Sequence, residues 1–177
     1  TAASVCERLR LLGAEVRVHG GVWDEANEEA LRLCREQAAA YVPPFDHPDI
    51  WDGNASLIDE AVAQGAEFDA VICSVGGGGL MCGVLQGLQR NGLSHIPVLA
   101  VETEGAASLA AAMQAGEPVT LPAITSIATS LAARRVAAEA LAWTRRHDVR
   151  SVIVSDRQAT HACRRFADDM RTLVEPA

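Results

Sequence analysis

The sequence predicts an α/β fold with an open parallel sheet and helices on both faces of that sheet. Short apolar runs at 68–75, 96–101 and 151–154 alternate with longer segments of helical pattern. Parallel strands need a crossover connection between them, which is usually a helix. The four glycines Gly76–Gly79 follow the first run, at the strand end where ligands bind in such sheets.

The first part of the chain predicts two helices with a strand between them. Residues 2–12 place apolar side chains at helical spacing and stop at Gly13, and residues 14–19 then alternate as in a strand. Residues 24–40 are rich in Ala, Glu, Leu and Arg and predict the second helix. Prolines break this pattern, so residues 41–53 are predicted to form a structured loop.

The remaining elements follow the rhythm of strand and helix. A short helix closed by Gly65 precedes the first strand, and a helix follows the glycines. Ser155 or Asp156 can cap the last helix, which runs to Met170. The predicted helices are 56–64, 81–91, 107–115 (closed by Gly116) and 132–146, with a Thr/Ser-rich connection at 121–131 and the start of a further element at 172–174.

Composition indicates a globular protein. The chain has 177 residues and a net charge of -8, which disfavours nucleic acid as a partner because binding a polyanion needs clustered basic residues. No apolar run approaches the roughly 18 residues that span a bilayer, and no signal segment opens the chain, so no membrane partner is expected and a soluble cytoplasmic protein is the default. The five cysteines are scattered and odd in number, as expected of reduced thiols packed as small hydrophobes.

Metal chemistry and lysine chemistry are poorly supported within the chain. The five histidines lack metal-ligand spacing, and the group Asp46, His47 and Asp49 favours local turn hydrogen bonds over a metal site. All fifteen basic residues are Arg. A Walker-type loop or a lysine Schiff base therefore cannot be complete within this chain.

The glycine loop itself admits three interpretations. Bare N–H groups at a strand–loop–helix junction make a cradle for an anion such as a phosphate, whereas a tight turn would use the glycines only for close backbone packing. Gly77, Gly79 and Gly83 also resemble a relaxed dinucleotide fingerprint, with Glu102 about 20 residues on, where a ribose-binding acid belongs. The strict spacing is not met, because position 82 is Cys.

Four motifs in order carry a family resemblance. They are Pro-Pro-Phe-Asp-His-Pro-Asp-Ile-Trp-Asp-Gly at 43–53, Ser-Val-Gly-Gly-Gly-Gly-Leu at 74–80, Glu-Thr-Glu-Gly-Ala at 102–106 and Leu-Val-Glu-Pro-Ala at 173–177. Together they resemble the serine/threonine dehydratases of the fold type II pyridoxal-phosphate enzymes, closest to the serine dehydratase branch. The resemblance implies that residues 1–20 are a remnant of a smaller α/β domain and that 21–177 are part of the large, phosphate-binding domain.

The resemblance also implies the ligands of the site. Glu102 and Ala106 match a monovalent cation site, for an ion such as potassium, although a carboxylate that caps the next helix is the alternative for Glu102. The stretch Ser130-Leu131-Ala132 resembles a segment beside the cofactor ring that often ends in glycine, and the methyl group of Ala132 is expected to narrow the substrate pocket or to shift the ring. The residues that bind the phosphate of pyridoxal 5'-phosphate are expected to be Gly76, Gly77, Gly78, Gly79 and Leu80.

The implied reaction is β-elimination from L-serine or L-threonine, giving pyruvate or 2-oxobutanoate and ammonia, in a homodimeric ammonia-lyase. The family's Schiff-base lysine and its contact to the pyridine nitrogen fall outside residues 1–177, so the chain is expected to be incomplete at both ends, to contain no catalytic residue and to be inactive alone. A racemase or β-replacement synthase of the same fold, and a non-catalytic nucleotide-binding domain, remain alternatives.

Overall fold

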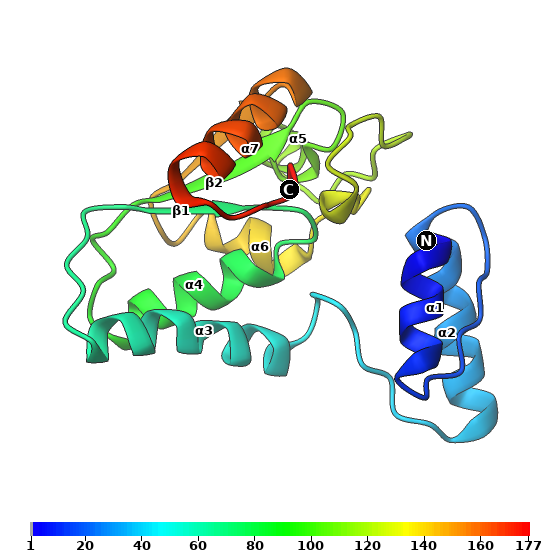
Figure 1. The fold of residues 1–177 in the computed structure, drawn as a ribbon. Coiled ribbons are helices and arrows are strands. Elements are labelled where there is room, and N and C mark those ends of the chain that lie inside the picture. The colour runs from blue at the N-terminus through cyan, green and yellow to red at the C-terminus, as the bar shows by residue number, and fades with distance from the viewer. Residues whose placement is uncertain (1) are drawn as a thin grey trace. The chain divides into compact units, whose positions relative to one another are not determined.

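The first compact unit consists of two helices. The computed structural model describes residues 2–177, and in it α1 spans Ala3–Leu11 and α2 spans Trp23–Gln37 (Figure 1). Both predicted helices are therefore confirmed, and α2 ends where Ala38 adopts a left-handed conformation with φ 51°. This unit extends to Val42, and the predicted domain division between residues 20 and 21 stays a prediction.

The predicted strand at residues 14–19 is wrong. These residues form no strand, and all three strands of the described chain lie in the second unit, from Pro43 to Ala177. An alternating sequence becomes a strand only when a neighbouring strand accepts and donates its backbone hydrogen bonds. The first unit offers no such neighbour among the described residues.

A parallel three-stranded sheet organises the second unit, as the sequence predicted. The strands β1 (Val71–Ser74), β2 (Val98–Thr103) and β3 (Val149–Val154) pair in the order β1-β2-β3. Val71 lies opposite Val98, which lies opposite Val149, so the carboxyl ends of the strands meet at one edge. Figure 1 shows α4 (Gly79–Arg90) and α6 (Ala138–Trp143) on one side of this sheet and α7 (Asp156–Met170) on the other.

Helix α3 begins earlier than the sequence predicted. It spans Pro48–Ala63, so residues 48–53 of the expected loop belong to the helix. His47 caps the helix, because its Nδ1 accepts a hydrogen bond from the Asp49 N–H at 3.2 Å, and Pro48 occupies the first turn, where its missing N–H costs nothing. The local turn hydrogen bonding predicted for this group is thereby confirmed.

Helices α3 and α4 pack against each other closely. A Cβ atom at Gly83 would lie 2.4 Å from the Asn54 Cβ, and one at Gly87 would lie 2.7 Å from the Ile58 Cβ. Glycine at these two positions lets the helix backbones approach. The core of the second unit includes fully buried side chains of α3, α4 and α5 (Ser108–Ala115), among them Ile58, Met81, Leu85, Leu88 and Leu109.

Among the C-terminal helices, α6 is shorter than predicted. Helix α5 spans Ser108–Ala115 and ends at Gly116 with φ 76°, as predicted. Of the two caps predicted for α7, the structure has Ser155, which forms a capping box with Gln158. The helix predicted over 132–146 is only partly right, since α6 has six residues. Residues 172–174 form no regular element, and no helix among the described residues is long and apolar enough to cross a membrane.

Candidate functional site

The glycine loop joins β1 to α4 at the carboxyl edge of the sheet. The last bond that ties it to β2 is donated by the Val75 N–H to the Val101 carbonyl oxygen, at 2.8 Å. Gly78 then adopts φ 91°, a left-handed conformation that favours glycine, and forms the N-cap of α4. The loop therefore ends at the positive end of a twelve-residue helix.

A run of backbone donors in this loop has no protein acceptor among residues 2–177. Within the described chain, the N–H groups of the residues from Gly76 to Leu80 donate no hydrogen bond to another protein group. Unpaired N–H groups at a helix N-terminus form a site that favours an anion. The loop thus has the donor set that a phosphate group requires.

Protein atoms pack tightly against all four glycines. Added Cβ atoms would approach the Leu131 Cα to 2.9 Å at Gly76, the Phe45 ring to 2.3 Å at Gly77, the Ala140 Cβ to 2.6 Å at Gly78 and the Phe45 carbonyl oxygen to 2.6 Å at Gly79. The close packing that the tight-turn interpretation requires is therefore present, against backbone atoms at Gly76 and Gly79 and against side chains at Gly77 and Gly78. It is compatible with an anion cradle, because the N–H groups still have no acceptor among the described residues.

Phe45 is held in place by the helix that follows it. Its carbonyl oxygen accepts a hydrogen bond from the Trp51 Nε1–H at 2.8 Å, which fixes the chain between the loop and α3. The sequence marked residues 41–53 as a structured loop but gave no sign that Phe45 packs against the glycines. Contacts of this kind depend on tertiary packing, not on local pattern.

Glu102 lies at the end of β2 and is completely buried. Its two carboxylate oxygens accept hydrogen bonds from the Leu109 and Ala110 N–H groups, each at 2.8 Å, so the side chain caps α5. Burial raises the pKa of this carboxyl, and the two N–H bonds oppose that shift. The capping alternative is therefore present in the structure, and the cation role stays a prediction.

The groups around Glu102 that could bind a cation are oxygen atoms. The Ala106 carbonyl oxygen accepts a hydrogen bond from the Ser108 N–H at 3.2 Å. Among the described residues no cluster of three or more His, Cys, Asp or Glu side chains could hold a metal ion. The hydroxyl oxygens of Thr103 and Ser108 are buried without hydrogen-bond partners, so oxygen ligands with unused capacity do occur in this region.

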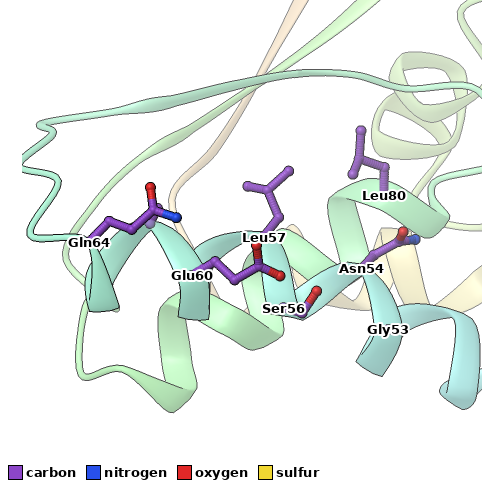
Figure 2. Close-up of a pocket in the computed structure, with 8 residues that line it drawn as sticks. Gly53, Asn54, Ser56, Leu57, Glu60, Gln64 and Leu80 are labelled. Atoms are coloured by element: carbon purple, nitrogen blue, oxygen red, sulfur yellow. The ribbon is translucent and has the colours of Figure 1, made fainter.

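A shallow groove of about 500 Å³ runs along α3 next to the glycine loop. Figure 2 shows Leu57 and Leu80 projecting on the same side of this groove, with the polar side chains of Glu60 and Gln64 along its length. Leu80 belongs both to the groove and to the run of N–H donors. The sequence analysis did not predict the groove, because it is formed between two elements that are separated by the whole of β1.

Two of the free cysteines are buried, and His147 contacts the backbone. Cys73 and Cys82 are buried, and burial raises their thiol pKa values to about 11 and about 12. His147 contacts the Ile96 carbonyl oxygen through Nε2 at 2.7 Å. Neither type of residue contributes to the site at the glycine loop. Ala132, the predicted departure from the glycine of the family motif, has φ -75°, a conformation that any residue adopts.

Comparison with known families identifies the family of the chain. The profile of the family described as pyridoxal-phosphate dependent enzyme matches residues 1–177. The chain belongs to this family. The resemblance drawn from the four motifs is confirmed, whereas the binding of a phosphate by the glycine loop stays a prediction.

Individual proteins are similar to this chain over nearly all of its length. The chain is 50% identical over 178 residues to the serine dehydratase-like protein of Mus musculus, covering 100% of this chain and 54% of that protein. It is 46% identical over 179 residues to L-serine dehydratase/L-threonine deaminase of Homo sapiens, covering 100% and 55%. The L-serine ammonia-lyase from Rhizomucor miehei has a similar fold, with a TM-score of 0.91, 37% identity and coverage of 99% of this chain and 56% of that one. The chain spans about half the length of the curated relatives it matches.

Proposed function

We propose that the full-length protein is an L-serine or L-threonine dehydratase that releases pyruvate or 2-oxobutanoate and ammonia by β-elimination. The observation that carries the proposal is the run of unpaired N–H donors from Gly76 to Leu80 at the start of α4, in a chain of the pyridoxal-phosphate dependent family. The names of the relatives support the choice of serine and threonine as substrates.

The loop residues have one role in this proposal, which is to hold the cofactor by its phosphate. The N–H groups of Gly76, Gly77, Gly78, Gly79 and Leu80 donate to the phosphate oxygens, and the positive end of α4 adds a favourable field. The cofactor supplies the electron sink for cleavage at the substrate Cα. Residues 1–177 contain no lysine, so the amine that binds the cofactor covalently comes from outside them, and this chain alone is expected to be inactive.

A monovalent cation such as potassium is proposed beside the loop, with Glu102 and the Ala106 carbonyl as ligands. Each carboxylate oxygen of Glu102 has lone-pair capacity beyond the single N–H bond that it accepts. The buried, unpartnered hydroxyl oxygens of Thr103 and Ser108 add further oxygen donors to the region. A cation here would also offset the burial of the Glu102 charge.

Two further properties belong to the proposal. A homodimer is expected from the resemblance to serine dehydratases, and sedimentation of the full-length protein tests it.

A cytoplasmic location is supported by the five unpaired thiols, which persist in a reducing compartment. Cell fractionation tests the location, and recovery of disulfide-bonded protein from an oxidising compartment would contradict it.

The decisive experiment uses purified full-length protein with pyridoxal phosphate. We expect visible absorbance from the bound cofactor and formation of pyruvate from L-serine, or of 2-oxobutanoate from L-threonine. D-Serine as the main product would show a racemase, and exchange of the β-substituent would show a synthase. Binding of a nicotinamide dinucleotide without binding of pyridoxal phosphate would overturn the proposal.

A further inference from the structure

The segment from Leu121 to Ala137 packs against one side of the glycine loop. Its Leu131 backbone lies where a Cβ atom at Gly76 would be 2.9 Å away, and the Ala137 N–H donates to the Gly77 carbonyl oxygen at 3.0 Å. A shift of this segment therefore moves the backbone of the loop. Because the N–H groups of a loop point where its peptide planes point, the segment also determines the direction of the donors.

This segment has little regular structure of its own. Its one helical element is the 3₁₀ turn η1, Thr129–Leu131. At its base, the Leu121 N–H donates to the Arg134 carbonyl oxygen at 2.8 Å, and the Arg134 Nε–H donates to the Leu121 carbonyl oxygen at 2.7 Å. These bonds close the base of the segment but do not fix its far end, at Ser126 to Ala128.

Asp156 holds that far end, together with the Gly105 carbonyl oxygen, which accepts a hydrogen bond from the neighbouring Thr125 N–H at 3.1 Å. Its Oδ1 accepts a hydrogen bond from the Ser126 Oγ–H at 2.7 Å, and its Oδ2 accepts one from the Ile127 N–H at 3.1 Å. The Ser126 Oγ accepts in turn from the Ala128 N–H at 3.0 Å, and Ser126 is only 8% exposed. One carboxylate thus orders three consecutive residues of the segment.

The carboxylate is itself held by a well-anchored element. Asp156 is the first residue of α7, a fifteen-residue helix that follows β3 directly and is capped by Ser155 through bonds to Gln158. The sequence analysis considered Asp156 only as a helix cap. In the structure that task belongs to Ser155, and the Asp156 side chain is directed to the segment instead.

We propose that Asp156 is a positioning residue for the phosphate cradle. By holding Ser126 and Ile127 it keeps Leu131 and Ala137 against the glycine loop, and so keeps the loop N–H groups directed at one point. This role rests on the proposed function, because it presumes that the loop binds the phosphate of pyridoxal phosphate.

A double-mutant cycle in the full-length protein tests the role. The variants are Asp156→Ala, Ser126→Ala and their combination, and the readouts are the Kd for pyridoxal phosphate and the ³¹P resonance of the bound phosphate. Asp168→Asn is the matched control, because Asp168 is an exposed acid of the same helix. Ser126→Ala leaves α7 intact, so it remains informative if Asp156→Ala weakens the helix by removing a favourable charge at its N-terminus.

We expect each single variant to raise the Kd by about three- to tenfold and to shift the ³¹P resonance, since a hydrogen bond to a charged group is lost. The double variant should be no worse than the weaker-binding single variant, because both substitutions break the same contact. The control should match wild type. Unchanged Kd and ³¹P values in both single variants, or fully additive effects, would overturn the positioning role while the proposed function stands. A wild-type protein that binds no pyridoxal phosphate would overturn both.

Discussion

Two glycines inside neighbouring helices should respond oppositely to the same substitution. Gly83 lies in α4, where an added Cβ would be 2.4 Å from the Asn54 Cβ and 2.7 Å from the Trp51 carbonyl oxygen, whereas an added Cβ at Gly53 in α3 meets nothing within 4 Å. Glycine costs a helix interior about 1 kcal/mol relative to alanine. Overpacking costs about 1–3 kcal/mol, and here it involves rigid backbone.

Gly83→Ala should therefore lower the free energy of unfolding by up to about 2 kcal/mol, and Gly53→Ala should raise it by up to about 1 kcal/mol. Urea unfolding of the full-length protein, with equal m-values as a check on the denatured state, measures both. A Gly83→Ala protein at least as stable as wild type would refute the close packing of α3 on α4. The substitution pair is informative for function too, since α4 carries the glycine loop at its start.

Two further predictions follow from burial. Cys73 and Cys82 should resist alkylation at pH 8 in the native protein, because burial raises the pKa of these thiols to about 11 and about 12, whereas the less buried Cys34 should react. A mass-spectrometric time course measures the three rates, and equal rates would contradict the prediction. Glu102→Gln should remove a pH dependence. The folded protein holds the Glu102 proton to a higher pH than the unfolded chain does, so unfolding releases a proton and wild type loses stability relative to the variant as pH rises from about 4.5 toward neutral. Urea titrations in potassium-free buffer should show this trend. Added potassium should restore the stability of wild type but not change that of the variant. A rise in the stability of wild type relative to the variant over the same pH range would show that folding lowers the pKa of Glu102.

The strands and the helix ends at glycine were predictable because their signals are local. Val98 to Val101 is an apolar run of the right length for a buried strand, and Gly116 supplies the left-handed residue that ends α5. The start of α3 also had a local signal, His47 followed by Pro48, but the prolines of this stretch were interpreted as the mark of a loop. The predicted strand at 14–19 failed because pairing is not a local property.

The supports of the candidate site could not be predicted from the sequence. Residues 132–137 have helix-forming composition, yet the Ala137 N–H donates to the Gly77 carbonyl oxygen, 60 positions away along the chain. Asp156 and Ser126 are 30 residues apart and meet at the carboxyl edge of the sheet. The glycine loop was recognisable from its composition, whereas the groups that shape it come from segments that only the parallel topology brings together.

The phosphate cradle can be tested most directly by comparing the affinity of the full-length protein for pyridoxal phosphate and for pyridoxal, which lacks the phosphate. Two or more charge-assisted hydrogen bonds of about 1.5–3 kcal/mol each predict that the phosphate form binds at least about 100-fold more tightly. Gly77→Ala, whose Cβ would lie 2.3 Å from the Phe45 ring, should reduce this ratio, and Gly53→Ala should preserve it. Equal affinities for the two forms in wild type, or a ratio unchanged by Gly77→Ala, would contradict the assignment of the glycine loop.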